Sequence, residues 1–165
     1  MSENRKPIVS IVMGSRSDLP TMEACFNQLK EFDIPFEAHA LSAHRTPDEV
    51  IKLSEGAKER GIKVIIAAAG GAAHLGGVLA SSTTLPVIGV PIQTSALGGM
   101  DSLLSTVQMS WWNSCRNCLR LVKLGLKMPQ FLAAQMIALS DETLAEKLDA
   151  FKKSMADKVK ADSSN

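Results

Sequence analysis

Short apolar runs alternate along this chain with longer stretches in which apolar residues recur at helical spacing. The runs are rich in Val and Ile, which is typical of buried strands, and they lie at residues 8–13, 35–41, 64–68 and 86–90. The helical spacing predicts helices at residues 18–32, 47–60 and 72–82, and two more between 130 and 160. Strands that alternate with helices favour a parallel sheet with right-handed crossovers. The pattern therefore predicts an α/β fold: a single three-layer, doubly wound parallel sheet with C-terminal helices.

Residues that favour helix ends stand near the predicted boundaries. Ser17 or Asp18 can cap the first helix, because their side-chain oxygens can accept hydrogen bonds from free backbone N–H groups. Gly61 is expected to end the second helix. Ser140 or Asp141 is expected to cap the last one.

Length, charge and cysteine count limit the kinds of protein that this chain can be. A chain of 165 residues with 45% hydrophobic content can form one core, so we expect a single catalytic domain over residues 1–165, with flexible tails at about 1–6 and 161–165. The formal charge of +1 gives no reason to expect nucleic acid or a membrane as a partner. Three cysteines make an odd count, which argues against a secreted disulfide framework and favours a cytoplasmic protein.

Three segments that follow predicted strands carry the candidate chemistry, and the first is Gly14-Ser-Arg-Ser-Asp18. A glycine after a strand allows a tight turn, and the free N–H groups of the next helix favour a phosphate. Ser15, Ser17 and Asp18 are the candidate ligand-binding residues here. An ordinary capped turn between a strand and a helix would use the same residues.

The second segment is Ser42-Ala-His-Arg-Thr-Pro47. Arg45 can bind a phosphate through two N–H groups, and Ser42 can donate a further hydrogen bond. His44 titrates near neutral pH and can both take and return a proton. The alternative is a surface loop with an incidental histidine.

The third segment, residues 67–77, consists largely of Gly and Ala, with His74 near its end. Gly70 and Gly71 allow a flat ligand to approach the backbone closely, whereas the small residues from Ala72 onward can serve tight packing. His74 is either a second site residue or the polar start of an interface. His39, inside the second predicted strand, is interpreted as structural.

Several stretches, in order, resemble the family of N5-carboxyaminoimidazole ribonucleotide mutases, the small subunits of the phosphoribosylaminoimidazole carboxylase system. They are Val12-Met-Gly-Ser-Arg-Ser-Asp18, Ser42-Ala-His-Arg-Thr-Pro47, Ala69-Gly-Gly-Ala-Ala-His-Leu75, Gly89-Val-Pro-Ile-Gln93, Met100-Asp-Ser-Leu103, Val107-Gln-Met109 and Phe131-Leu-Ala-Ala-Gln135. Motifs that match in the same order are far more specific than any one of them.

The resemblance implies a flavodoxin-like domain that assembles as a homo-octamer with sites at subunit junctions. It also implies an enzyme of de novo purine biosynthesis, a ribonucleotide substrate and no metal or organic cofactor. In this family a carboxylate leaves the exocyclic nitrogen as carbon dioxide and is reattached to the imidazole carbon. His44 would move the proton on and off that carbon. The implied substrate-binding residues are Ser15, Ser17, Asp18, Ser42, Arg45, Gly70, Gly71, Ala72, His74 and Leu75.

Two other functions are compatible with these residues. One is a carboxylase that takes free carbon dioxide and 5-aminoimidazole ribonucleotide. The more remote one is a flavin- or nucleotide-binding module without catalysis, which the same kind of fold can support.

Residues 110–129 depart from the family completely, and they contain both tryptophans and a Cys115-x-x-Cys118 pair. A zinc site would need further ligands, so we reject that interpretation. With permitted codons, residues 110–118 read one base later give Pro-Gly-Gly-Ile-Pro-Val-Ala-Thr, and residues 119–129 read two bases later give Ala-Ile-Gly-Lys-Ala-Gly-Ala-Lys-Asn-Ala. Both are family sequence. We therefore interpret residues 110–129 as an out-of-frame reading.

Overall fold

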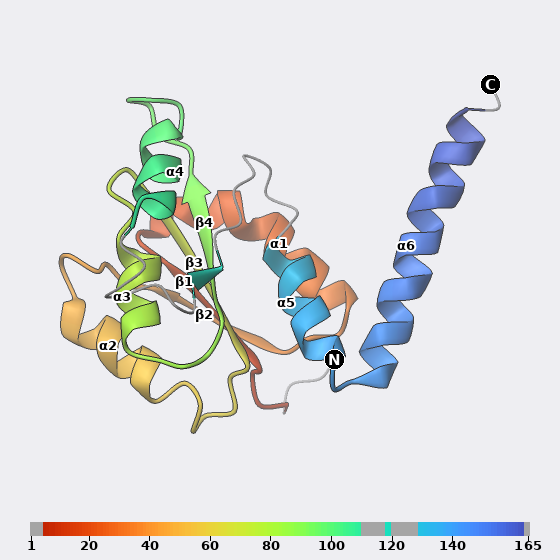
Figure 1. Ribbon diagram of the computed structural model, residues 1–165, viewed down its shortest axis with the longest axis horizontal. Helices are drawn as coiled ribbons and strands as arrows, with labels where there is room; N and C mark the ends of the chain where they lie inside the picture. The colour runs from red at the N-terminus through yellow and green to blue at the C-terminus, as the bar shows by residue number, and fades with distance from the viewer. Residues whose placement is uncertain (1–4, 110–117, 120–128, 164–165) are drawn as a thin grey trace.

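A parallel sheet forms the centre of the computed structural model, which describes residues 5–109, 118–119 and 129–163 (Figure 1). Within these residues the sheet has five strands in the order β2-β1-β3-β4-β5. The strands are β1 (Val9–Met13), β2 (Phe36–Ala40), β3 (Val64–Gly70), β4 (Val87–Ile92) and the short β5 (Cys118–Leu119). The helices are the 3-10 turn η1 (Arg16–Asp18), α1 (Leu19–Glu31), α2 (Pro47–Glu55), α3 (Leu75–Ser81), α4 (Met100–Val107), α5 (Pro129–Ala138) and α6 (Glu142–Asp162).

Alternate residues of the strands face two separate cores. In β3, Ile66 packs with α1 and α5, whereas Ile65 packs with α2 and α3. This period of two is what an extended strand buried on both faces produces. Ile11 of β1 lies beside Ile66, which lies beside Ile88 of β4. The predicted three-layer, doubly wound parallel fold is confirmed.

Two predicted helix boundaries are wrong. The second helix, α2, ends at Glu55 with Gly56 as its C-cap, and Gly61 ends the following turns with φ of 94°. Gly56 has a low helix propensity, which explains the earlier stop. The third helix, α3, begins at Leu75 instead of residue 72, because Gly71 has φ of 67° and residues 71–74 form a loop.

The structure adds two elements, α4 and β5, that were not predicted. The predicted N-cap of the last helix is confirmed, since the Asp141 carboxylate accepts a hydrogen bond from the Leu144 N–H at 3.0 Å at the start of α6. The predicted side-chain cap of the first helix is wrong, because Asp18 is the N-cap residue of α1 but its carboxylate instead accepts from the Ser15 N–H of the preceding turn. Helix α6 lies beside α5 and extends beyond it (Figure 1).

Within the two predicted tails, Arg5 forms an ion pair with Asp33, and residues 161–162 belong to α6. No helix in the described part of the chain is long and apolar enough to cross a bilayer.

Most of the segment interpreted as an out-of-frame reading, residues 110–117 and 120–128, lies outside the described residues. The strand β5 falls within it and pairs with β4, with Cys118 beside Val87. Pro129, at its end, is the buried first residue of α5. Cys118, Leu119 and Pro129 are thus the residues of this segment that the structure describes.

Candidate active site

A pocket of about 270 Å³ lies at the carboxyl edge of the sheet, where the loops after β1, β2 and β3 meet. This edge is where doubly wound sheets bind ligands. Every predicted site residue except Arg45 and Gly71 lines the pocket, together with three small residues that were not predicted. The lining residues are Gly14, Ser15, Ser17, Asp18, Ser42, Ala43, His44, Ala69, Gly70, Ala72, His74 and Leu75.

The loop after β1 is fixed by a capping box. The Ser15 hydroxyl accepts a hydrogen bond from the Ser17 N–H at 3.3 Å, and the Asp18 carboxylate accepts one from the Ser15 N–H at 3.2 Å. Asp18 is buried, and this burial raises the pKa of its carboxyl, although the hydrogen bonds from Ser15 and Ser17 oppose the shift. The capped turn and the candidate binding site therefore use the same residues.

The loop after β2 is organised by Ser42. Its hydroxyl accepts hydrogen bonds from the backbone N–H groups of His44 at 3.4 Å and of Arg45 at 3.3 Å. Its own N–H donates to the Thr46 hydroxyl at 3.0 Å. These local bonds hold His44 at the pocket and leave Arg45 exposed, outside the pocket lining. The Ser42 hydroxyl thus accepts backbone hydrogen bonds in this structure, a role beyond the predicted donation to a ligand.

The loop after β3 is anchored to α4. The Gly71 N–H donates to the Ser102 hydroxyl at 2.8 Å, and that hydroxyl donates to the Ile92 carbonyl at 2.6 Å. Ser102 is fully buried. The positive φ of Gly71 turns the chain toward α3, so that His74 reaches the pocket as the N-cap residue of that helix. Ser102 is not among the predicted site residues, although it stands in the stretch Met100-Asp-Ser-Leu103, whose match to the family was the signal that could have indicated it.

His44 and His74 meet across the pocket, although they come from different loops. His44 Nε2 lies 2.9 Å from His74 Nδ1, and the two rings are nearly perpendicular at 88°. Both side chains are exposed, so a ligand can reach them. The third histidine, His39, pairs with Glu37 at 3.3 Å on β2, which agrees with its structural interpretation. The pocket therefore combines two imidazoles, one carboxyl and several small residues, which suits proton transfer on a small polar ligand.

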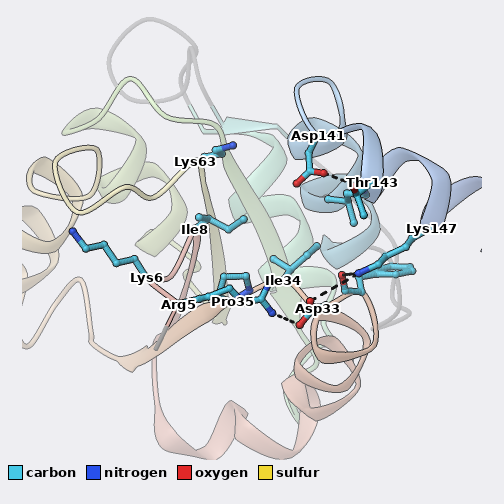
Figure 2. Close-up of a pocket in the computed structure, with 12 residues that line it drawn as sticks. Arg5, Lys6, Ile8, Asp33, Ile34, Pro35, Lys63, Asp141, Thr143 and Lys147 are labelled. Atoms are coloured by element: carbon cyan, nitrogen blue, oxygen red, sulfur yellow. Dashed lines mark hydrogen bonds and ion pairs between the residues drawn. The ribbon is translucent and has the colours of Figure 1, made fainter. Parts of the chain in front are cut away.

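A larger hollow of about 580 Å³ lies at the opposite edge of the sheet, before the strands begin (Figure 2). Three of its charged side chains form ion pairs: Asp33 lies between Arg5 and Lys147, and the Lys147 Nζ is 4.0 Å from the carboxylate. Lys147 also donates to the Phe32 carbonyl at 3.4 Å. These contacts join the N-terminal segment, the α1–β2 turn and α6. We assign these ion pairs a structural role, since they connect three separate segments of the chain.

The fold and the smaller pocket define a class, the doubly wound α/β proteins that carry a small-molecule pocket at the carboxyl edge of a parallel sheet. Comparison with known proteins identifies the family. Residues 8–158 match AIR carboxylase. The chain is 53% identical over 144 residues to N5-carboxyaminoimidazole ribonucleotide mutase of Bacillus subtilis (strain 168), covering 87% of this chain and 88% of that protein. The chain therefore belongs to the AIR carboxylase family, as the motifs predicted.

Two further comparisons agree. The N5-carboxyaminoimidazole ribonucleotide mutase of Vibrio parahaemolyticus is 47% identical over 153 residues, which are 93% of this chain and 94% of that protein. The crystal structure of PurE from Treponema denticola matches the fold with a TM-score of 0.82 and 28% identity, over 96% of this chain and 97% of that one.

Proposed function

We propose that this chain is an N5-carboxyaminoimidazole ribonucleotide mutase of de novo purine biosynthesis, which produces 4-carboxy-5-aminoimidazole ribonucleotide. The observation that carries the proposal is 53% identity to a mutase of that name over 87% of the chain. The pocket supports it, because it places His44 among small residues at the edge of the sheet where ligands bind.

The reaction requires one proton to be delivered and one to be removed. When the bond between the exocyclic nitrogen and the carboxylate breaks, carbon dioxide leaves and the nitrogen gains a proton. When carbon dioxide then bonds to the ring carbon, that carbon loses a proton. We assign both steps to His44, because an imidazole can donate a proton from one ring nitrogen and accept one at the same position.

The other pocket residues are assigned to binding. The carboxylate of Asp18 can accept hydrogen bonds from ribose hydroxyls, and the hydroxyl of Ser15, at the turn of η1, can donate one to the phosphate. Arg45 is assigned to the phosphate, which it can reach from outside the pocket lining because its side chain is long and exposed. Gly70 and Ala72 leave room for the flat ring and for carbon dioxide, whose retention beside the ring is a positioning effect.

Isotope labelling tests the mutase against the carboxylase alternative. The purified protein is given substrate with a ¹³C-labelled carboxylate in unlabelled bicarbonate buffer. A mutase transfers the label into product, and it needs no added bicarbonate. A carboxylase instead incorporates unlabelled carbon from solution and works equally well from 5-aminoimidazole ribonucleotide plus bicarbonate, a result that would refute the proposal.

The variant His44→Asn separates the enzyme from a non-catalytic binding module. We expect it to abolish turnover while it still binds substrate in a phosphate-dependent manner, because Asn cannot titrate near neutral pH. In a binding module, in contrast, the wild-type protein would bind the ribonucleotide without converting it. Calorimetric titration with the substrate and with its dephosphorylated nucleoside measures the binding.

We further propose that the protein is a cytoplasmic homo-octamer. The exposed apolar side chains support self-association, since such patches on a protein surface mark interaction sites. Among the described residues, these large apolar side chains are Leu19 at the start of α1, Leu97, Met100 and Leu104 in and before α4, and Leu139, Met155 and Val159 after α5 and in α6. Light scattering should give eight times the mass of one chain, whereas a monomer would contradict the proposal. Cell fractionation tests the location.

A further inference from the structure

The contact between His44 and His74 restricts where the protons of the two rings can be. Their nitrogens, Nε2 of His44 and Nδ1 of His74, are 2.9 Å apart, so the hydrogen bond between them contains one proton. Two arrangements are open: either His44 donates from Nε2, or His74 donates from Nδ1. The two differ in which nitrogen of neutral His44 is basic.

The first arrangement leaves His44 Nδ1 free as a base. In the second arrangement, neutral His44 carries its proton on Nδ1, and its Nε2 accepts the hydrogen bond from His74 Nδ1. The His44 ring then has no free basic nitrogen. An accepting Nδ1 on His74 therefore supports catalysis, and a donating one opposes it. A partner on one imidazole nitrogen generally fixes the role of the other in this way.

We propose that His74 is a positioning residue that accepts the His44 Nε2–H bond and thereby makes His44 Nδ1 the nitrogen that exchanges a proton with the substrate. This inference rests on the proposed mutase function. Protonated His44 gives its Nδ1 proton to the exocyclic nitrogen as the bond to the carboxylate breaks and carbon dioxide forms. The ring carbon then bonds to carbon dioxide, and its proton returns to Nδ1. The Nε2 proton stays on His44 throughout.

Among the described residues, few other charged groups lie near His44 and His74. Asp18 is the remaining titratable side chain that lines the pocket, and it is held by Ser15 and Ser17 on the β1 loop. Arg45 follows His44 in the same loop and is exposed. On α4, Asp101 accepts hydrogen bonds from Thr94 at 2.8 Å. Among the described residues, His74 is the group whose ring contacts the His44 ring.

Two variants with matched side-chain shape test the proposal. In His74→Asn the amide oxygen can occupy the position of Nδ1 and still accept the bond, whereas His74→Leu has a similar shape and no acceptor. We expect His74→Leu to lower kcat by about 10- to 100-fold, as loss of a partner that orients a functional histidine does in metal sites, with a smaller effect on KM. His74→Asn should restore most of that loss.

Nitrogen-15 NMR of the ligand-free protein gives a readout independent of turnover. The chain has three histidines, and His44→Asn and His39→Gln assign their signals. We expect the neutral Nε2–H tautomer of His44 in the wild type and in His74→Asn, and a mixture of tautomers in His74→Leu. An Nδ1–H tautomer in the wild type would overturn the inference, even if His74→Leu failed to fold. Equal kcat in two folded variants would overturn it as well. A wild-type protein with the expected tautomer but no turnover would instead refute the proposed function.

Discussion

Ser102 offers a quantitative test of how the β3 loop is held. Its fully buried hydroxyl accepts from the Gly71 N–H at 2.8 Å and donates to the Ile92 carbonyl at 2.6 Å. Replacement by alanine removes one oxygen atom and leaves both backbone groups without their partner. No new side chain is introduced, so the effect isolates these two hydrogen bonds.

The expected loss follows from the burial of the two groups. Leaving a buried donor or acceptor unpaired costs about 1–3 kcal/mol. Ile92 is 7% exposed, so its carbonyl has little access to water, whereas Gly71 is half-buried and its N–H can recover part of the loss by hydration. We therefore expect Ser102→Ala to lower the free energy of unfolding by about 2–4 kcal/mol.

Urea unfolding at one fixed protein concentration measures this change, because the stability of an oligomer depends on concentration. Ser81→Ala is the matched control, since the Ser81 hydroxyl also donates to a carbonyl, that of Val78 at 2.8 Å, but on the exposed surface. The control should change stability by less than about 0.5 kcal/mol. If the two variants unfold at the same urea concentration, the buried bridge does not hold the loop and the reasoning fails.

Three further predictions concern the backbone, pH and the atypical segment. Gly71→Ala should destabilise by about 1–2 kcal/mol in urea unfolding through its positive φ alone, since an added Cβ meets no atom within 4 Å; an unchanged midpoint would contradict this. The hydrogen bond from Arg5 lowers the pKa of Asp33 in the folded protein. The wild type should therefore be more stable than Asp33→Asn above pH about 4, and this advantage should vanish as the pH falls through the lowered pKa. Thermal melts at several pH values measure the difference. Both tryptophans lie in residues 110–129, and the chain has no tyrosine. If this segment is an out-of-frame reading, the tag-free, ligand-free protein expressed from its natural gene should show only phenylalanine absorption. A tryptophan band would show that the segment is present.

The layers of the fold were readable from the sequence because the central strands β3 and β4 are continuous runs of apolar and small residues. Val64 to Ala68 must be buried on both faces, and only a sheet covered by helices on both sides provides this. The location of the pocket was also predictable. Parallel strands bring their carboxyl ends to one edge, so the polar residues after β1, β2 and β3 had to meet there.

Other features depend on contacts between distant segments and leave no local pattern. The bond between His44 and His74 joins residues 30 positions apart, and its geometry follows from how two loops leave the sheet. Helix α4 begins after Gly99, which has φ of 95° and no side chain to cap the helix, so no start signal was present. Arg45 was predicted in the site from its charge, its place beside His44 and the family resemblance, but the Ser42 turn leaves it outside the pocket lining.

The two edges of the sheet have different roles, and the larger of the two cavities is not the candidate active site. The larger hollow, at the amino edge, contains opposite charges that already engage one another, as Asp33 does with Arg5 and Lys147 (Figure 2). A ligand there would have to replace existing ion pairs. At the carboxyl edge, backbone turns position the polar groups, and His44 and His74 stay exposed to solvent. Substitutions at the amino edge should therefore lower stability more than activity, and substitutions at the carboxyl edge should lower activity more than stability. Ser102 is an exception, because it supports both the fold and the pocket loop.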